Sequence, residues 1–244
     1  MPGIAWALIN FLMAIYAGLW CLLWILVGTI LLLLRCDARV PLMAARRFWA
    51  PGILWVASRG FEVRGLDRVD FSRPHVFAAN HQSMLDVPVL IGALPAPLLF
   101  VVKEELRRVP LLGAYMRALG MIFIRRRARR GSLDELGQSA RRLAEGKSLL
   151  IFPEGTRSPD GRIGPFKPGA FLPAIDAGAT IVPVAMDGPG RVLPRGGFRV
   201  RPGKITVAVG SPVPTADLGR EDRKALARQV HRQTVELWQG LQSL

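Results

Sequence analysis

The stretch from Asn80 to Asp86 contains the residues best suited to chemistry, His81 and Asp86. Imidazole titrates near neutral pH, so His81 can accept a proton from a hydroxyl group. A carboxylate on the other ring nitrogen would fix the tautomer and stabilise the imidazolium, and Asp86 is the candidate. On one continuous helix, five residues separate two side chains by about 140°. We therefore expect the pair to meet only if His81 lies in the turn before the helix.

The same spacing has an ordinary structural explanation. Ser83 can cap a helix that starts near Met84, and Asp86 can lie in its first turn, where the helix dipole favours a carboxylate. A lone histidine and aspartate at this spacing occur often by chance. Other motifs in the chain are therefore needed to support a catalytic role for the pair.

A second polar turn follows another apolar run. Residues 153–158 come directly after residues 148–152, which read as a buried strand. In this turn, Gly155 would let the backbone approach a ligand closely, Arg157 offers a planar fork for phosphate oxygens, and Thr156 can donate a hydrogen bond. The turn is predicted to bind an anion, with an ordinary surface turn as the alternative.

Both turns are expected at strand ends in an α/β domain. Val76–Ala79 reads as a buried strand and Met84–Leu90 as the start of a helix, so His81 falls at a strand-to-helix turn. Strand-like and helical stretches alternate, which favours a mixed, largely parallel sheet flanked by helices. The other predicted strands are 61–69, 98–102, 121–124, 148–152, 181–184 and 204–209, and the last predicted helix is 221–241.

The first 34 residues contain no charged side chain and predict a membrane helix. Such a helix would be about 50 Å long, against about 30 Å of bilayer hydrocarbon. It could cross once with tilt, or fold back near Gly18 and enter one leaflet. A cleaved signal peptide is disfavoured by the length and the lack of basic residues at the start. A fully buried core helix is the remaining alternative.

Residues 41–58 mix aromatic side chains with Arg46 and Arg47, a combination that suits the lipid headgroup layer. We expect an interfacial helix here, interrupted at Pro51-Gly52, with an ordinary core helix as an equal alternative. Residues 1–60 would then form a membrane module and residues 61–244 the α/β domain.

The net charge is +15, and all 33 basic residues lie at or beyond Arg35. Basic residues directly after an apolar segment favour the cytoplasmic side of a membrane, so the downstream chain is expected there. With an anchor present, an anionic bilayer surface is a better partner for this charge than nucleic acid. The arginine-rich run 125–130 also lacks the interleaved aromatic side chains of a base-stacking platform.

Common cofactor and nucleophile motifs are absent from the sequence. Cys21 and Cys36 form no CxxC pattern or His/Cys cluster, so neither a disulfide framework nor a metal site is predicted. Residues 146–148 resemble the end of a phosphate loop, but Arg141 occupies the glycine position and the segment precedes a strand. A Gly-x-Ser-x-Gly elbow is missing too. We expect no metal and no cofactor.

Taken together, four sequence blocks resemble the motifs of the glycerolipid acyltransferases, especially the bacterial 1-acyl-sn-glycerol-3-phosphate acyltransferases. The likeness runs from about Pro74 to Asp187, and the apolar N-terminus looks like that family's membrane module. The first and third blocks are specific in combination. The blocks are Asn80-His81-x-Ser83-x-x-Asp86, Gly120-x-x-Phe123-Ile124-x-Arg126, Phe152-Pro153-Glu154-Gly155-Thr156-Arg157-Ser158 and Ile181-Val182-Pro183-Val184.

The resemblance implies transfer of an acyl group from acyl-carrier protein or coenzyme A to the free hydroxyl of a lysophospholipid. The product would be phosphatidic acid, made at the cytoplasmic face of a bacterial inner membrane. His81 and Asp86 would be the catalytic pair, and one base is enough because a thiolate is a good leaving group. The substrate-binding residues would be Asn80, Ser83, Lys103, Arg126, Glu154, Gly155, Thr156 and Arg157.

Two other functions fit the sequence. An acyltransferase of the same family could act on another lysolipid, such as lyso-ornithine lipid, because the extra arginines after Ile124 are not part of the family pattern. A basic membrane-attached binding protein would make His81 and Asp86 incidental. If the chain is an enzyme, backbone N–H groups at the start of the helix after His81 are candidates to stabilise the oxyanion, and the sequence does not single one out.

Overall fold

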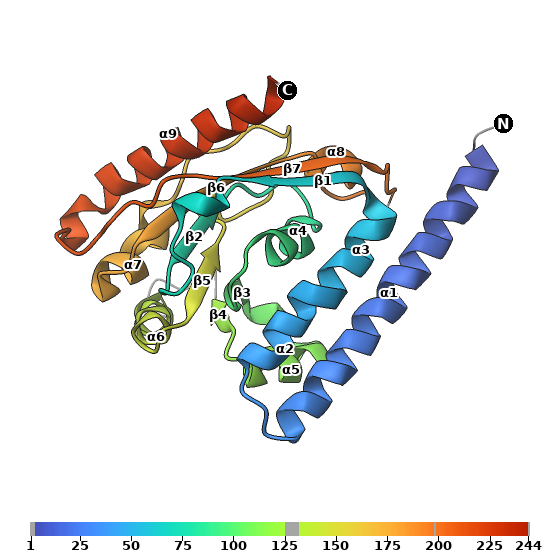
Figure 1. The fold of residues 1–244 in the computed structure, drawn as a ribbon, viewed down its shortest axis with the longest axis horizontal. Coiled ribbons are helices and arrows are strands. Elements are labelled where there is room, and N and C mark those ends of the chain that lie inside the picture. Colours follow the sequence, from blue (N-terminus) through green and yellow to red (C-terminus); the bar gives the residue numbers. More distant parts are fainter. Residues whose placement is uncertain (1–2, 125–131, 198, 244) are drawn as a thin grey trace.

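The computed structural model describes residues 3–124, 132–197 and 199–243. Within these residues the chain forms a seven-stranded sheet in the order β1-β7-β6-β2-β5-β3-β4 (Figure 1). Strands β6, β2, β5, β3 and β4 run parallel, whereas β7 and β1 run in the opposite direction, which confirms a mixed, largely parallel sheet. The strands are β1 (Ser58–Arg64), β2 (Val76–Ala79), β3 (Leu98–Lys103), β4 (Ile122–Ile124), β5 (Ser148–Ile151), β6 (Ile181–Asp187) and β7 (Gly203–Val209).

Helices cover both faces of the sheet (Figure 1). On one face, α3 and α4 pack against a core that includes Phe77 and Ala79, and on the other, α7 and α9 pack against a core that includes Val76 and Ala78. Because successive strand residues point to opposite faces, a strand covered on both sides must be apolar throughout. This explains the uninterrupted apolar sequence of β2.

The helical segments complete the chain between the strands. The α-helices are α1 (Gly3–Leu33), α2 (Arg39–Ala44), α3 (Ala50–Ala57), α4 (Asp86–Ala93), α5 (Leu112–Ala118), α6 (Ser132–Ala144), α7 (Leu172–Ala177), α8 (Pro189–Val192) and α9 (Arg223–Gln242). The 3₁₀ segments are η2 (Leu66–Arg68), η3 (Glu104–Arg108), η4 (Pro168–Phe171) and η5 (Arg220–Asp222), and η1 (Ala45–Trp49) is a π-helical turn.

The strand predicted at 61–69 is displaced to Ser58–Arg64. Gly65 ends it with a φ of +76°, and a Cβ at this position would lie 2.2 Å from the Val209 carbonyl oxygen. Only glycine fits both the left-handed backbone and the close approach to β7.

Helix α1 is long and apolar enough to cross a membrane, and in the described part of the chain it is the only helix that is. It lies beside α3 (Figure 1), with Trp20 Nε1 donating to the Trp49 carbonyl (3.0 Å). Within Gly3–Leu33, only Gly28 is buried, beneath the ring of Tyr115. A fully buried core helix is therefore excluded. The face turned away from the domain exposes Leu8, Phe11, Leu12, Ile15, Leu19, Leu22, Leu26 and Ile30.

The expected interruption at Pro51-Gly52 is wrong. Helical structure continues from Arg39 to Ala57, because the π-helical turn lets the Ala50 N–H donate to the Ala45 carbonyl just before Pro51. Pro51 is tolerated because it lies in the first turn of α3, where a backbone N–H has no partner within that helix and its loss therefore costs little. Gly52 packs against Trp20, whose Nε1 would lie 2.3 Å from a Cβ at this position.

Candidate active site

Three parallel strands end at the same edge of the sheet and bring the predicted site together. His81 follows β2, residues 153–158 follow the adjacent β5, and Lys103 ends β3. The two turns are joined directly, since the Ser158 N–H donates to the His81 carbonyl oxygen (2.7 Å). In open α/β sheets this carboxyl edge is where ligands bind.

His81 and Asp86 meet because His81 precedes the helix. Helix α4 begins at Asp86, and the intervening residues form the turn leading into it. His81 Nδ1 lies 2.7 Å from Asp86 Oδ2. The Asp86 side chain is fully buried, whereas that of His81 is 17% exposed. With Nδ1 donating to the carboxylate, Nε2 is the ring nitrogen left to act as a base.

The Asp86 carboxylate is held by two further donors. The N–H groups of Gln82 (2.6 Å) and Ser83 (2.9 Å) both donate to the oxygen that accepts from His81. Burial raises the pKa of Asp86, while the hydrogen bonds from His81 and the two N–H groups act in the opposite direction. Because Asp86 accepts from both of these N–H groups, neither is free to donate to an oxyanion.

Phe152 fixes the plane of the imidazole. It follows β5, and its ring stacks on that of His81 with 4.0 Å between the centroids and 16° between the planes. Sequence reasoning assigned Phe152 to a strand and gave it no role in the site. The pairing of β2 with β5, which brings the rings together, joins segments about 70 residues apart and leaves no local signal.

Glu154 faces the protein interior. Its Oε1 accepts from the His81 N–H (2.8 Å) and its Oε2 from the Gly164 N–H (3.0 Å), and the residue is 7% exposed. Burial raises the pKa of Glu154, and the two N–H donors partly offset this. We therefore propose that Glu154 positions the backbone of His81 and does not contact substrate.

Glu154→Gln is expected to lower both stability and turnover. An amide keeps one acceptor but turns an NH₂ group toward one of the two N–H donors, and a buried donor without a partner costs about 1–3 kcal/mol. Urea unfolding and steady-state turnover would measure the two effects. The control is Glu145→Gln, which alters an exposed glutamate on a surface ion pair. Equal behaviour of the two variants would refute the positioning role.

The side chains of Asn80 and Ser83 are also hydrogen-bonded to backbone groups of the protein. Asn80 is fully buried, donates to the Met186 carbonyl (3.0 Å) and accepts from the Met186 N–H (2.7 Å). The Ser83 hydroxyl donates to the Leu193 carbonyl (2.7 Å) and accepts from the Leu85 N–H (3.1 Å). We propose that both residues position the catalytic turn, in place of the substrate contacts implied by the resemblance.

The second turn is cationic. Gly155 has a φ of +71°, and a Cβ there would lie 2.6 Å from Lys167 Nζ, so glycine makes room for the lysine. Arg195 donates to the Arg157 carbonyl oxygen (2.7 Å), which brings a further guanidinium to the turn. No carboxylate in the described residues pairs with the side chain of Arg157 or Lys167. Like charges gathered without a counter-ion favour an anionic ligand.

The remaining predicted residues have varied positions. Thr156 and Lys103 are exposed at the same edge of the sheet. Arg126 lies outside the described residues. Lys167 and Arg195 were not predicted, because they come from loops that reach the turn only in the folded chain. Among the residues that the structure describes, no cluster of three or more His, Cys, Asp or Glu could hold a metal ion.

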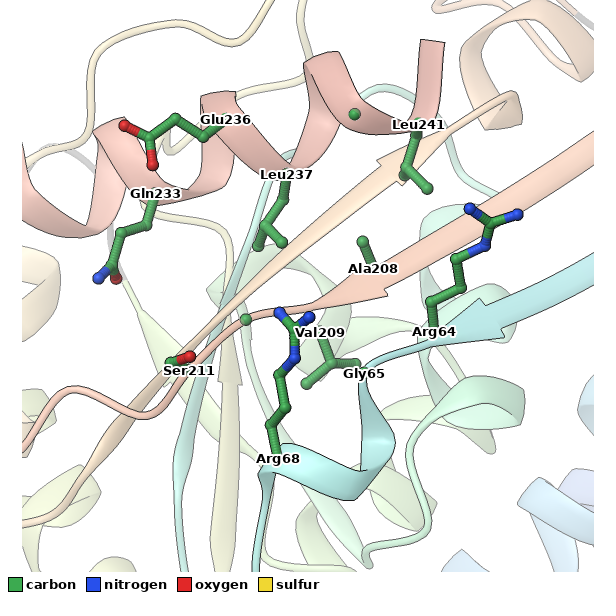
Figure 2. A pocket seen from close by; sticks show the side chains of 12 residues that line it. Arg64, Gly65, Arg68, Ala208, Val209, Ser211, Gln233, Glu236, Leu237 and Leu241 are labelled. Carbon is green, nitrogen blue, oxygen red and sulfur yellow. The ribbon is translucent and has the colours of Figure 1, made fainter. Parts of the chain in front are cut away.

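Two cavities lie away from this site. One, of about 450 Å³, lies between α9 and the ends of β1 and β7, with Arg64, Arg68 and Leu237 on its walls (Figure 2). The other, of about 460 Å³, lies beside Asp187 and Arg191. Neither is lined by His81 or by residues 153–158.

An imidazole backed by a buried carboxylate, beside a cationic turn, defines a site that can deprotonate a hydroxyl group on an anionic molecule. This is the kind of site expected in an enzyme that activates a hydroxyl group. A family model described as Acyltransferase matches residues 60–187. The chain belongs to the acyltransferase family.

Individual relatives agree with the family assignment. A 1-acyl-sn-glycerol-3-phosphate acyltransferase of Pseudomonas aeruginosa is 34% identical over 208 residues, covering 82% of this chain and 78% of that protein. The crystal structure of the 1-acyl-sn-glycerophosphate acyltransferase PlsC from Thermotoga maritima superposes with a TM-score of 0.83 and 27% identity, covering 98% of both chains.

Some relatives are much longer. A chloroplastic 1-acyl-sn-glycerol-3-phosphate acyltransferase of Brassica napus is 34% identical over 154 residues, which is 62% of this chain and 44% of that protein. The chain thus spans less than half the length of this chloroplast relative.

Proposed function

We propose that this protein is an O-acyltransferase that acylates the free hydroxyl of 1-acyl-sn-glycerol-3-phosphate and produces phosphatidic acid. The observation that carries the proposal is the His81–Asp86 pair, hydrogen-bonded at 2.7 Å and joined through His81 to the cationic turn. The pair supplies a base for the hydroxyl, and the turn supplies charge for the phosphate. The names of the Pseudomonas and Thermotoga relatives support this substrate.

The proposed reaction needs one base and no covalent intermediate. His81 Nε2 takes the hydroxyl proton as the oxygen attacks the thioester carbonyl carbon, and Asp86 stabilises the resulting imidazolium. The tetrahedral intermediate then breaks its carbon–sulfur bond, and the imidazolium returns the proton to the departing thiolate. Acyl-carrier protein and coenzyme A both present such a thioester, so either can serve as donor.

Acceptor choice tests the function. Purified protein with an acyl thioester should acylate 1-acyl-sn-glycerol-3-phosphate with a kcat/KM at least about 100-fold above that for 1-acylglycerol, since a charge-assisted contact contributes about 1.5–3 kcal/mol and the turn offers more than one. A higher kcat/KM for lyso-ornithine lipid would show that this lipid is the acceptor. Binding of lysolipid without turnover would support the non-catalytic binding protein.

Arg157→Gln is expected to raise the KM for the phosphate-bearing acceptor by about 10–100-fold and to leave the KM for the donor unchanged. The planar guanidinium makes paired hydrogen bonds to phosphate oxygens that a neutral amide cannot replace. Initial rates over both substrate concentrations separate the two constants. Arg228→Gln, an exposed arginine on α9, is the charge-matched control. An effect on the donor alone would reassign Arg157.

We also propose that the exposed face of α1 inserts into a bacterial inner membrane. The α/β domain then lies on the cytoplasmic face, next to anionic headgroups. The exposed leucines of α1 and the net charge of +15 support this location. Leu12→Asp with Leu19→Asp should shift the protein from the membrane to the soluble fraction, because each buried charge costs about 2.5–3.5 kcal/mol. Gln239→Asp on α9 is the control. Unchanged fractionation of the α1 variant would contradict this placement.

A further inference from the structure

The connection between β6 and β7, described at residues 188–197 and 199–202, contacts the catalytic turn. Met186, just before it, is bound by the Asn80 side chain, and Leu193 within it accepts from the Ser83 hydroxyl. Gly190 lies close to Gln82, since a Cβ on the glycine would be 3.2 Å from the glutamine Cβ. The turn that carries His81 is therefore held at Asn80 by the end of β6, and at Gln82 and Ser83 by the β6–β7 connection.

The same connection is bound to the apolar helix α1. The Val200 N–H donates to Asn10 Oδ1 (2.6 Å), a contact between residues 190 positions apart. Asn10 Nδ2 donates to the Trp6 carbonyl within α1 (3.0 Å), which orients the amide so that its oxygen accepts from the domain. Arg201, next to Val200, donates its N–H to the Val192 carbonyl (2.8 Å) and ties this end of the connection back to α8.

Asn10 is unusual in its helix. Asparagine is a poor helix former and costs free energy in an apolar segment. Two hydroxyl side chains of α1 act only as donors: Thr29 donates to the Ile25 carbonyl of the same helix (2.7 Å), and Tyr16 donates to the Gly52 carbonyl of α3 (3.2 Å). Asn10 differs because its oxygen accepts from another part of the fold.

On the basis of the proposed function, we propose that Asn10 is a positioning residue that couples the docking of α1 to the geometry of the catalytic pair. The coupling passes from Asn10 to Val200, across the hydrogen bond from the Arg201 N–H to the Val192 carbonyl, and from the adjacent Leu193 to Ser83. Ser83 reaches the pair itself, because its own N–H donates to Asp86 Oδ2 (2.9 Å).

The physical basis is the cost of a half-buried N–H without an acceptor. Without the Asn10 oxygen, the connection must rearrange to satisfy Val200, and Leu193 moves with it. Val192 is 1% exposed and belongs to the same hydrophobic core as Val89 and Leu90 of α4, so movement of this segment is transmitted by packing as well as by hydrogen bonds. The protein would be fully active only when α1 is docked.

The test uses three single variants in lipid vesicles, with vesicle binding and thermal melting measured for each. Asn10→Leu removes the acceptor and keeps α1 apolar, and kcat is expected to fall about tenfold with both KM values unchanged. Asn10→Gln keeps a neutral amide oxygen for Val200 and should retain at least half of the wild-type kcat. Thr29→Val removes a polar group from the same helix and should match the wild type.

Two further measurements separate positioning from a general loss of structure. Asn10→Leu combined with Ser83→Ala should be no slower than Ser83→Ala alone, because both changes break the same chain of contacts. Hydrogen exchange should accelerate in Asn10→Leu at residues 82–86 and remain slow in β7, whereas global destabilisation would accelerate both.

Wild-type kcat in Asn10→Leu, equal losses in Thr29→Val, or fully multiplicative effects with Ser83→Ala would each overturn the coupling. If Asn10→Leu binds vesicles poorly, the exchange pattern at residues 82–86 in detergent decides the question by itself. His81→Ala in the same assay keeps the two proposals apart. Its failure to abolish turnover would refute the proposed function, whereas a normal Asn10→Leu beside an inactive His81→Ala would refute the coupling alone.

Discussion

His81→Ala is expected to reduce kcat by about 10²–10⁴-fold, the range that a positioned general base contributes. The hydroxyl of the acceptor is a weak nucleophile until it loses its proton, and His81 Nε2 is the base that the structure leaves available. The KM values should change little, because the cationic turn proposed to bind the phosphate remains. Release of free thiol from the acyl donor, followed with a chromogenic reagent, measures the rate directly.

A matched control is His231→Ala. This histidine lies on α9, where its ring packs edge-on against Phe166, and it belongs to the opposite face of the sheet. Thermal melting of both variants would show that each is folded. If His81→Ala keeps more than about a tenth of the wild-type kcat, the base must be another group and the mechanism proposed above is wrong.

The second large effect is expected from Asp86→Asn, with a loss of about 10²–10³-fold in kcat. The amide oxygen can still accept from Gln82 and Ser83, so the turn should keep its shape. What is lost is the negative charge 2.7 Å from His81 Nδ1 that stabilises the imidazolium. If the amide flips, its NH₂ faces Nδ1 and favours the tautomer in which Nε2 carries the proton and cannot act as a base.

The two losses should not multiply. A variant with both His81→Ala and Asp86→Asn is expected to be about as slow as His81→Ala alone, because the aspartate acts only through the imidazole. Asp176→Asn, which breaks a surface ion pair with Arg220, is the control for loss of a carboxylate. Multiplicative losses would show that Asp86 contributes independently of His81.

Much of this site could be predicted from local sequence. The apolar run Val76–Ala79 marks a strand covered on both faces, and its bounds are those observed. The demand that His81 precede the helix that contains Asp86 follows from helix geometry alone, and the structure meets it. The polar turn after β5 could be recognised as a candidate anion site from Gly155 and Arg157.

The contacts that hold the site could not be predicted in the same way. The partners of Asn80, Ser83 and Glu154 are backbone groups, and any residue type can supply a backbone N–H or carbonyl. Their positions depend on which strands pair, and β2 pairs with strands about 70 and 105 residues further along the chain. These three side chains, expected to bind substrate, are hydrogen-bonded to the backbone around His81, and we propose that they position it.

The docking of α1 along the domain has a practical consequence for anyone preparing the protein. Tyr16, Trp20 and Gly28 cover Gly52, Trp49 and Tyr115, so the helix behaves as an outer wall of the domain. A shortened version without α1 would expose apolar aromatic surface of the domain and leave the Trp49 and Gly52 carbonyls without their hydrogen-bond donors. Such a version would aggregate, so detergent extraction of the intact chain is the better route to active material.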